Sequence, residues 1–358
     1  MGEIAIEILA GGDIDKEKVV DDGTYPIYAN ALTNDGIVGY YNDYYRVKAP
    51  AVTVTGRGEV GHAQARMTDF TPVVRLLAIR SNHDCYFLEN AINNQNVVVE
   101  STGVPQLTVP QLSSYDICFP KDIREEEKIG AYYKKLDNLI TLHQRKCEET
   151  KKLKKYMLQK MFPQNGQTVP EIRFAGFTDA WEQRKLGDIC SRVQGNDGRM
   201  ELPTLTISAG NGWMNQEDRF SGNIAGKEQK NYTLLKRGEL SYNHGNSKLA
   251  KYGTVFSLQT YEEALVPRVY HSFKVEKGNA NFVEYYFATK LPDRELGKLI
   301  SSGARMDGLL NIGYDDFMGI SLLLPKTQEQ DCIAGYFRKI DMFITLHQHK
   351  CEQLQSMK

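Results

Sequence analysis

The chain has 358 residues, of which 41% are hydrophobic and 25% are charged, and its formal net charge is −1. These values are ordinary for a globular protein with two domains, and the charge neither indicates nor excludes nucleic-acid binding, because local patches neutralise phosphate. With no long apolar run, no signal peptide and no C-x-x-C pair among six cysteines, we expect a cytoplasmic protein without membrane spans, zinc knuckles or a disulfide framework.

Residues 1–120 are expected to consist mainly of strands and loops. Residues 51–55 and 97–99 are β-branched runs, and turn-forming residues such as those at 33–36 separate the strands. Residues 56–61 (Gly-Arg-Gly-Glu-Val-Gly) fit the dinucleotide fingerprint G-x-G-x-x-G, which must open a helix. The following residues soon reach Pro72, so we favour a strand-to-strand turn presenting Arg57. An enzyme that binds a nucleotide cofactor with this loop stays the alternative.

Residues 121–162 are expected to form a long helix, about 60 Å at 1.5 Å per residue. Asp122 suits its N-cap, and the three glutamates at 125–127 suit its positive end. Residues 163–173 then break the helix and form a linker.

Residues 174–326 are again expected to be rich in strands and loops, with a helical insert near 282–298. A second long helix is expected at 327–358. Residues 333–352 repeat residues 129–148 at a constant offset of 204, with twelve of twenty positions identical. A repeat this long predicts two copies of one large unit, each ending in the same helix. Outside the helices the two copies barely resemble each other in sequence.

Apolar residues on both helices recur at steps of three and four, which is the spacing of a coiled-coil seam. So narrow a stripe favours pairing between the two helices, although each could instead pack on its own domain. The seam histidines could ligate a metal, but we favour hydrogen-bonded core positions and expect no metal site. The expected seam consists of Tyr133, Leu136, Ile140, His143 and Cys147, with Phe337, Ile340, Ile344, His347 and Cys351.

No catalytic motif is found, including the Asn-Pro-Pro-aromatic tetrapeptide of amino-methyltransferases, so we expect no catalytic residues. The loops instead carry residue types that grip phosphates or read base edges, although loops are polar in any protein. In residues 1–120 the candidate DNA-binding residues are Asn34, Tyr45, Lys48, Arg57, Gln64, Arg66, Thr102 and Gln106. In residues 174–326 they are Asn211, Asn243, His244, Asn246, Lys248, Lys251, Tyr252, Arg268 and Arg305.

Taken together, these features resemble the specificity subunit of a type I DNA restriction-modification system. The most specific matches are residues 174–189 (Phe-Ala-Gly-Phe-Thr-Asp-Ala-Trp-Glu-Gln-Arg-Lys-Leu-Gly-Asp-Ile) and the repeated Ile-Thr-Leu-His-Gln of the helices. Residues 309–312 and 103–107 also resemble the ends of target-recognition domains. The resemblance implies an α+β protein with two β-rich target-recognition domains, 1–120 and 174–326, separated by two long antiparallel coiled-coil helices.

The resemblance further implies a non-catalytic subunit that reads a bipartite, asymmetric site in double-stranded DNA. Two modification subunits would bring the methyltransferase and S-adenosylmethionine for adenine methylation. Restriction subunits would bring cleavage driven by ATP and Mg. The sequence departs from the family pattern at both ends, since no counterpart of residues 174–186 precedes Gly2 and the second helix stops at Lys358.

Overall fold

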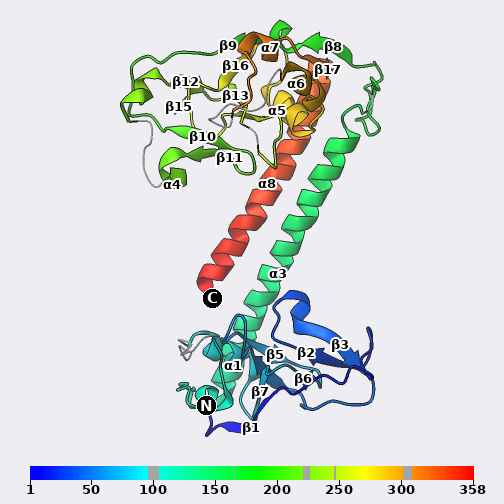
Figure 1. The fold of residues 1–358 in the computed structure, drawn as a ribbon, viewed down its shortest axis with the longest axis vertical. Helices are drawn as coiled ribbons and strands as arrows, with labels where there is room; N and C mark the ends of the chain where they lie inside the picture. Colours follow the sequence, from blue (N-terminus) through cyan, green and yellow to red (C-terminus); the bar gives the residue numbers. More distant parts are fainter. Residues whose placement is uncertain (96–104, 165, 221–225, 246, 301–308) are drawn as a thin grey trace. The chain divides into compact units, whose positions relative to one another are not determined.

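The computed structural model describes residues 1–95, 105–164, 166–220, 226–245, 247–300 and 309–358. The chain forms two compact units, residues 1–144 with 349–358 and residues 145–348. Two long helices, α3 (Ile123–Lys160) and α8 (Thr327–Met357), each contribute residues to both units, as the colours of Figure 1 allow the reader to follow. In the described part of the chain, no helix combines the length and apolar character that a membrane span requires.

The strands described in the first unit form two sheets. Their bounds are β1 Ala5–Ala10, β2 Tyr25–Tyr28, β3 Ile37–Tyr41, β4 Ala51–Val54, β5 Ala63–Arg66, β6 Thr71–Pro72 and β7 Leu77–Ser81. One sheet has the order β1-β7-β4-β5 with antiparallel neighbours, and the other has the order β3-β2-β6. Strand β4 corresponds to the run expected at 51–55, whereas the run at 97–99 lies outside the described residues.

Helix α1 (Cys85–Asn93) covers the four-stranded sheet and was not expected from the sequence. Its buried residues Leu88 and Ile92 share one hydrophobic cluster with Val54 and Ile79. The side chain of Asp84 accepts a hydrogen bond from the backbone N–H of Phe87 at 2.9 Å and so caps the helix. The other short helices described in this unit are η1 (Thr33–Gly36) and α2 (Val109–Ser113).

The second unit repeats the order of this sheet. Its strands are β8 Glu182–Lys185, β9 Cys190–Arg192, β10 Leu205–Ser208, β11 Gly212–Asn215, β12 Thr233–Lys236, β13 Leu240–Asn243, β14 Thr254–Ser257, β15 Glu263–Val266, β16 His271–Val275 and β17 Ser321–Leu324. Strands β9-β16-β13-β14 form an antiparallel sheet that matches β1-β7-β4-β5 strand for strand. Strands β10-β11, β12-β15 and β8-β17 form three antiparallel pairs.

Helix α5 (Ala280–Ala288) is the counterpart of α1, since it follows β16 as α1 follows β7. Its N-cap Asn279 accepts a hydrogen bond from the backbone N–H of Phe282 at 3.1 Å. Helices α5 and α6 (Asp293–Leu299) confirm the helical insert expected near 282–298. The remaining helices described here are η2 Leu186–Asp188, α4 Gln216–Phe220, η3 Gly226–Asn231 and α7 Tyr314–Met318. The duplication therefore extends to the β-rich modules, whose sequences hide it because cores tolerate many apolar combinations.

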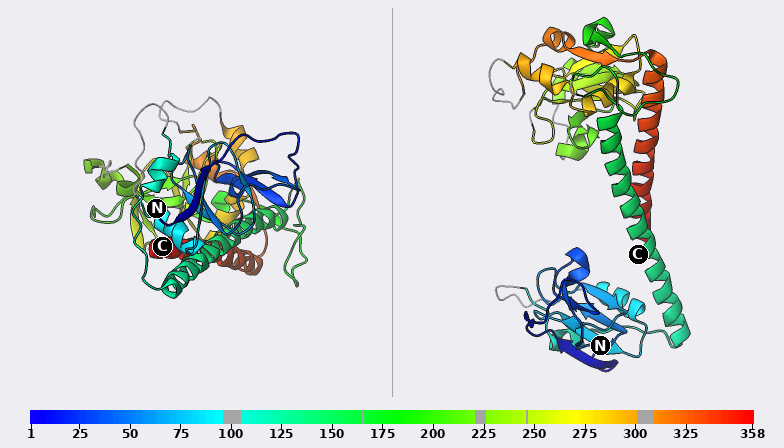
Figure 2. Two further views of the ribbon diagram at one scale, coloured as in Figure 1. Left: turned by 90° about the horizontal axis from the view of Figure 1, so that it is seen from below. Right: turned by 90° about the vertical axis from the view of Figure 1, so that its right-hand side faces the viewer.

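In the second unit, α3 and α8 run side by side in opposite directions (Figures 1 and 2). The Sγ atom of Cys147 lies 4.0 Å from the carbonyl oxygen of Ile344, and Nζ of Lys154 lies 2.5 Å from the carboxylate of Asp341. Since the α3 number rises while the α8 number falls, the pair is antiparallel, as expected.

The first unit repeats both contacts at the 204-residue offset. The Sγ atom of Cys351 lies 3.8 Å from the carbonyl oxygen of Ile140, and Nζ of Lys358 lies 2.6 Å from the carboxylate of Asp137. Each of these four residues is the counterpart of one in the preceding pair of contacts. The two helices thus make the same local contacts in each unit with their roles exchanged.

All residues of the expected seam lose solvent exposure. Leu136, Ile140, Cys147, Phe337, Ile340 and Cys351 are buried, and Tyr133, His143, Ile344 and His347 are half-buried. Phe337 also packs against Phe162 and Tyr285 of its own unit. Helix pairing and packing on a domain, weighed as alternatives from the sequence, therefore occur together.

Each module is attached to the first turn of the long helix that follows it. In the first unit, the buried carboxylate of Glu126 accepts a hydrogen bond from the backbone N–H of Asp84 at 2.5 Å and lies 2.9 Å from Nδ1 of His83. In the second unit, its counterpart Gln330 accepts from the backbone N–H of Asn279 at 3.0 Å. Asp84 and Asn279 are the N-caps of α1 and α5. The same hydrogen bond therefore connects each module to the long helix that follows it, and we call this connection the joint.

Gly130 and Gly335 provide a matched test of the first joint. A Cβ at Gly130 would lie 1.9 Å from Oδ1 of Asp84 and 3.0 Å from the backbone N of Phe87, whereas one at Gly335 meets nothing within 4 Å. We expect Gly130→Ala to destabilise the protein by about 1–3 kcal/mol through overpacking. Gly335→Ala should stabilise it by roughly 0.5–1 kcal/mol by reducing backbone entropy. Calorimetric unfolding measures both, and shifts of the same sign would contradict this joint.

Candidate nucleic-acid interface

The turn between β4 and β5 presents Arg57. The turn joins two antiparallel strands, so the strand-to-strand interpretation of residues 56–61 is confirmed. A dinucleotide fingerprint leads into a helix, whereas this loop leads into β5, and nothing here supports the alternative of a cofactor-binding enzyme. Gly56 is buried and Arg57 is exposed.

Asn30 joins this turn to neighbouring loops. Its Oδ1 accepts a hydrogen bond from the backbone N–H of Gly56 at 2.7 Å, and its Nδ2 donates to the carbonyl of Val74 at 2.5 Å. The backbone N–H of Leu107 donates to the carbonyl of Gly56 at 3.0 Å. Four segments distant in sequence, which carry Asn30, Gly56, Val74 and Leu107, therefore meet at one end of the sheet.

Arg75 is a functional candidate that the sequence analysis missed. Val74 and Arg75 have φ angles of +50° and +62°, a left-handed conformation that costs about 1–3 kcal/mol per residue outside glycine and is often found at functional sites. The turn leaves Arg75 exposed, and its Nη1 donates to Oε1 of Gln106 at 3.1 Å. Arg57, Arg75 and Gln106 therefore lie on three of the four joined segments.

Arg66, which the sequence suggested as a DNA contact, is buried. Its guanidinium lies 3.7 Å from the centre of the Tyr28 ring and 2.8 Å from the carboxylate of Asp35. Its Nε donates to Thr53 at 3.0 Å and its Nη2 donates to Gln64 at 2.7 Å. Burial raises the pKa of Tyr28, although Arg66 opposes the effect. This geometry favours a supporting role in which Arg66 holds Asp35 and Gln64.

Asn34 lies on the β2–β3 loop that also carries Asn30, and Tyr45 and Lys48 lie on the following loop. Asn34 is exposed, and its Nδ2 donates to the carbonyl of Ile37 at 3.1 Å. Tyr45 and Lys48 are exposed between β3 and β4, where the ring of Tyr45 lies 4.9 Å from that of Tyr25. Thr102 lies outside the described residues.

In the second unit, the β13–β14 turn is the counterpart of the β4–β5 turn. Lys248 and Lys251 are exposed on it. A Cβ at Gly210 would lie 3.4 Å from Leu249, so the β10–β11 turn, with the exposed Asn211, is adjacent. Asn246 and Arg305 lie outside the described residues.

His244 is buried as well and connects the loops of the second unit. Its Nδ1 lies 2.7 Å from the carbonyl oxygen of Leu310, and its Nε2 lies 2.8 Å from that of Val269. It stacks on His271 at 4.9 Å, and burial lowers the pKa of His271. His244 is therefore placed to support the turn that carries the exposed Arg268, rather than to reach DNA itself.

Two further candidates have partly structural contacts. The half-buried Asn243 donates from Nδ2 to the carbonyl of Ile207 at 3.2 Å. The carbonyl of Tyr252 accepts a hydrogen bond from the hydroxyl of Tyr242 at 2.7 Å. Both residues shape the ends of the β13–β14 turn.

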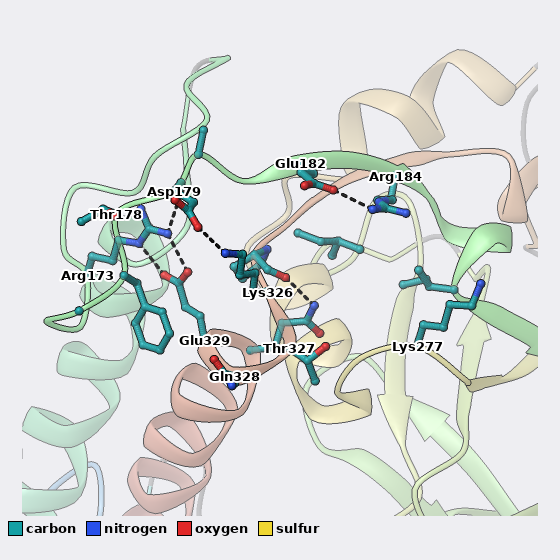
Figure 3. Close-up of a pocket in the computed structure, with 17 residues that line it drawn as sticks. Arg173, Thr178, Asp179, Glu182, Arg184, Lys277, Lys326, Thr327, Gln328 and Glu329 are labelled. Atoms are coloured by element: carbon teal, nitrogen blue, oxygen red, sulfur yellow. Dashed lines mark hydrogen bonds and ion pairs between the residues drawn. The ribbon is translucent and has the colours of Figure 1, made fainter.

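A cavity of about 680 Å³ lies between the linker and the start of α8 (Figure 3). Ion pairs line it, and they join Arg173 to Glu329, Lys326 to Asp179 and Arg184 to Glu182. The pair of Arg173 with Glu329 ties the linker to α8. Across the described residues, no group of three His, Cys, Asp or Glu side chains could hold a metal ion.

The arrangement can therefore grip phosphates and base edges from two corresponding loop clusters. The exposed cations stand on loops that polar side chains hold in place, namely the half-buried Asn30 in the first unit and the buried His244 in the second. Arginine and lysine donors of this kind suit phosphate oxygens and the acceptors of guanine. The exposed cations of these clusters are Arg57, Arg75, Lys248, Lys251 and Arg268.

Comparison with known proteins gives a match to a domain family and a structural likeness that covers nearly the whole chain. Residues 2–152 match the type I restriction modification DNA specificity domain. Two putative type I specificity subunits of Mycoplasma pneumoniae are 29% and 25% identical over 135 and 147 residues. These alignments cover 36% and 38% of this chain and 36% and 47% of the relatives, less than half of their length. The S subunit of a type I restriction-modification system from M. genitalium has a TM-score of 0.65 at 12% identity, covering 99% of this chain and 92% of that one.

Proposed function

We propose that this protein reads DNA sequence for partner subunits. The premise is that residues 2–152 belong to the family of type I restriction modification DNA specificity domains, and that the whole chain folds as a type I S subunit. The observation that carries the proposal is the duplicated loop cluster. Arg57 with Arg75 in one module, and Lys248 with Arg268 in the other, occupy corresponding turns of matching sheets. Each module would read one half of a bipartite, asymmetric site in double-stranded DNA.

The long helices would set the gap between the two half-sites. Helix α3 has 38 residues, about 57 Å at 1.5 Å per residue, and contributes to both units. The polar joints at Glu126 and Gln330 resist tilting of each module on its helix, because tilting would leave buried donors unpaired. We propose target-recognition domains at 1–120 and 174–326, a linker at 163–173, and spacer helices at 121–162 and 327–358.

Catalysis would belong to the partners. We propose that two modification subunits bind S-adenosylmethionine and methylate adenine, and that restriction subunits cleave DNA with ATP and Mg. This chain would direct both activities to its site.

The helices offer a surface for the two modification subunits. Phe343 and Leu346 are exposed on α8, and their counterparts Leu139 and Leu142 are half-buried on α3. Residues three apart are neighbours on a helix, so each pair forms an apolar patch away from the seam. One patch in each unit suits one modification subunit per unit.

Replacing an exposed arginine or lysine should change the salt dependence of DNA binding. We expect Arg57→Ala and Lys248→Ala each to reduce the slope of log K against log salt by about 0.9 for one lost phosphate contact. Lys121→Ala is the charge-matched control, because Lys121 is exposed just before α3 and outside the joined loops of its own unit. Mobility-shift titrations with the modification subunit, on a site found by mapping methylated adenines, measure the slopes. If both variants bind DNA with unchanged slopes, Arg57 and Lys248 do not belong to the interface.

Lengthening both helices together should widen the gap in the recognised site. Seven residues inserted after Cys147 and seven after Cys351 keep the seam periodicity and add about 10 Å. We expect the preferred gap to grow by about three base pairs, at 3.4 Å each. Genome-wide methylation mapping reads the gap directly. Methylation that persists at the original gap would defeat the spacer proposal.

A charge in the α8 patch should remove one modification subunit. We expect Phe343→Glu to lower the number bound from two to one, since the partner would have to bury an unpaired carboxylate. Thr345→Glu is the control, because Thr345 is exposed in the same turn but polar. Mass measurement of the assembled complex gives the count. Two subunits bound to the Phe343→Glu variant would place the contact elsewhere.

A further inference from the structure

Large aliphatic side chains stand directly beside exposed cations in both loop clusters. The pairs are Val74 with Arg75, Leu249 with Lys248, and Val269 with Arg268. Val74 and Val269 are 52% and 51% exposed, and Leu249, at 71%, is more exposed than any other large apolar residue in the described ranges. We refer to Val74, Leu249 and Val269 as the apolar tips.

The backbone of Val74 is fixed from two sides. Its N–H donates to the carbonyl of Gly12 at 2.9 Å, and its carbonyl accepts a hydrogen bond from Nδ2 of Asn30 at 2.5 Å. The φ of +50° is unusual for a β-branched residue, and glycine or asparagine adopts it more easily. Because half of the residue stays exposed, packing inside the module does not explain why a valine stands at this position.

The second module presents Val269 in the corresponding turn. This turn precedes β16 as the turn of Val74 precedes β7, and the two strands occupy the same place in their sheets. The carbonyl oxygen of Val269 lies 2.8 Å from Nε2 of the buried His244. Asn30 and His244 thus each fix the carbonyl of an exposed valine beside an arginine. The arrangement recurs in modules that barely resemble each other in sequence, which indicates that both use the aliphatic side chain.

Leu249 lies at the tip of a tight turn. The backbones of Ser247 and Ala250 exchange two hydrogen bonds of 3.2 Å, so Lys248 and Leu249 are the two central residues. Ala250 is buried and anchors the base of the turn, while both central residues remain exposed. The turn therefore holds a cation and a large aliphatic group side by side at its tip.

We infer that each apolar tip packs against the 5-methyl group of a thymine in the half-site that its module contacts. Thymine presents a methyl group in the major groove, and apolar side chains recognise this group by direct contact. The neighbouring arginines and lysine bind phosphates or guanine, which brings the tips to the depth of the base edges. The contact removes both apolar groups from water. The inference rests on the proposed function, because it names the base that the same loop clusters read.

A base edge explains the apolar tips better than a protein partner does. Each tip is a single aliphatic residue next to a cation, whereas the core of a protein interface is a continuous apolar surface. The pair of Phe343 and Leu346 on α8 has that continuous character, since both side chains are apolar, exposed and one turn apart.

Replacing thymine by deoxyuridine removes this methyl group and keeps the base pair. On a site found by mapping methylated adenines, each thymine of both half-sites is replaced in turn, and mobility-shift titrations with the modification subunit measure the affinity. We expect one thymine for each tip at which the replacement weakens binding about fourfold, the factor for one buried methyl group. Val74→Ala, Leu249→Ala and Val269→Ala should each reduce the effect at one of these thymines to less than about twofold.

Val38→Ala is the matched control, because Val38 is exposed on β3 and outside the joined segments. It should keep every thymine effect. Effects that all three tip variants retain, or the absence of any thymine effect, would overturn the inference. Weaker assembly of the Val74→Ala variant with the modification subunit without DNA would also overturn it, because the tips would then belong to a protein interface.

The same titrations separate this inference from the proposed function. Sequence-specific binding without any thymine effect would defeat the inference alone. Binding that does not distinguish the mapped site from unrelated DNA would defeat the proposed function, and the inference with it.

Discussion

The antiparallel pairing of α3 with α8 is the constraint on which the rest of the structure depends. Lys154 with Asp341 in one unit, and Lys358 with Asp137 in the other, make the same contact with the helices exchanged. A partly exposed ion pair contributes only about 0.2–1 kcal/mol, so these pairs act mainly on register while the apolar seam supplies stability. Because the two helices are held in register, the position at which each module attaches to its helix pair is fixed.

The modules gain a fixed orientation from buried polar joints. Glu126 and Gln330 each bind the N-cap of the helix that packs on their sheet. One is a carboxylate and the other an amide, yet both accept the same backbone hydrogen bond. The loops at the far ends of the strands are then free to diverge, which is how one scaffold can present two different reading surfaces.

The parts predicted from the sequence depend on local periodicity. The seam from Leu136 to Cys147 and its repeat could be predicted because apolar residues recur there at helical spacing and the second copy follows at a constant offset. The two long helices and the turn at Arg57 followed from such local signals, whereas the fold class was implied by the family resemblance of residues 174–189 and of the repeated helix. The cap of helix α1 is local, but the helix was missed because its docking depends on the backbone N–H of Asp84 meeting Glu126, 42 residues away.

The loop residues were harder to predict because their roles depend on partners distant in the chain. Arg66 has the residue type of a phosphate ligand, but Asp35, 31 residues away, and the ring of Tyr28 hold it inside. His244 is held by Leu310 in a similar way. Arg75 was missed because a left-handed turn at Val74 leaves no signature in composition.

Crosslinking within each unit tests the central pairing most directly. In a chain whose native cysteines are replaced by alanine, cysteines would be introduced at Lys154 and Asp341, or at Asp137 and Lys358, and treated with a short bifunctional maleimide. The account predicts intramolecular crosslinks in both pairs, detected by peptide mass. A crosslink between cysteines at Lys154 and Lys358, without the other two, would indicate parallel helices and contradict it.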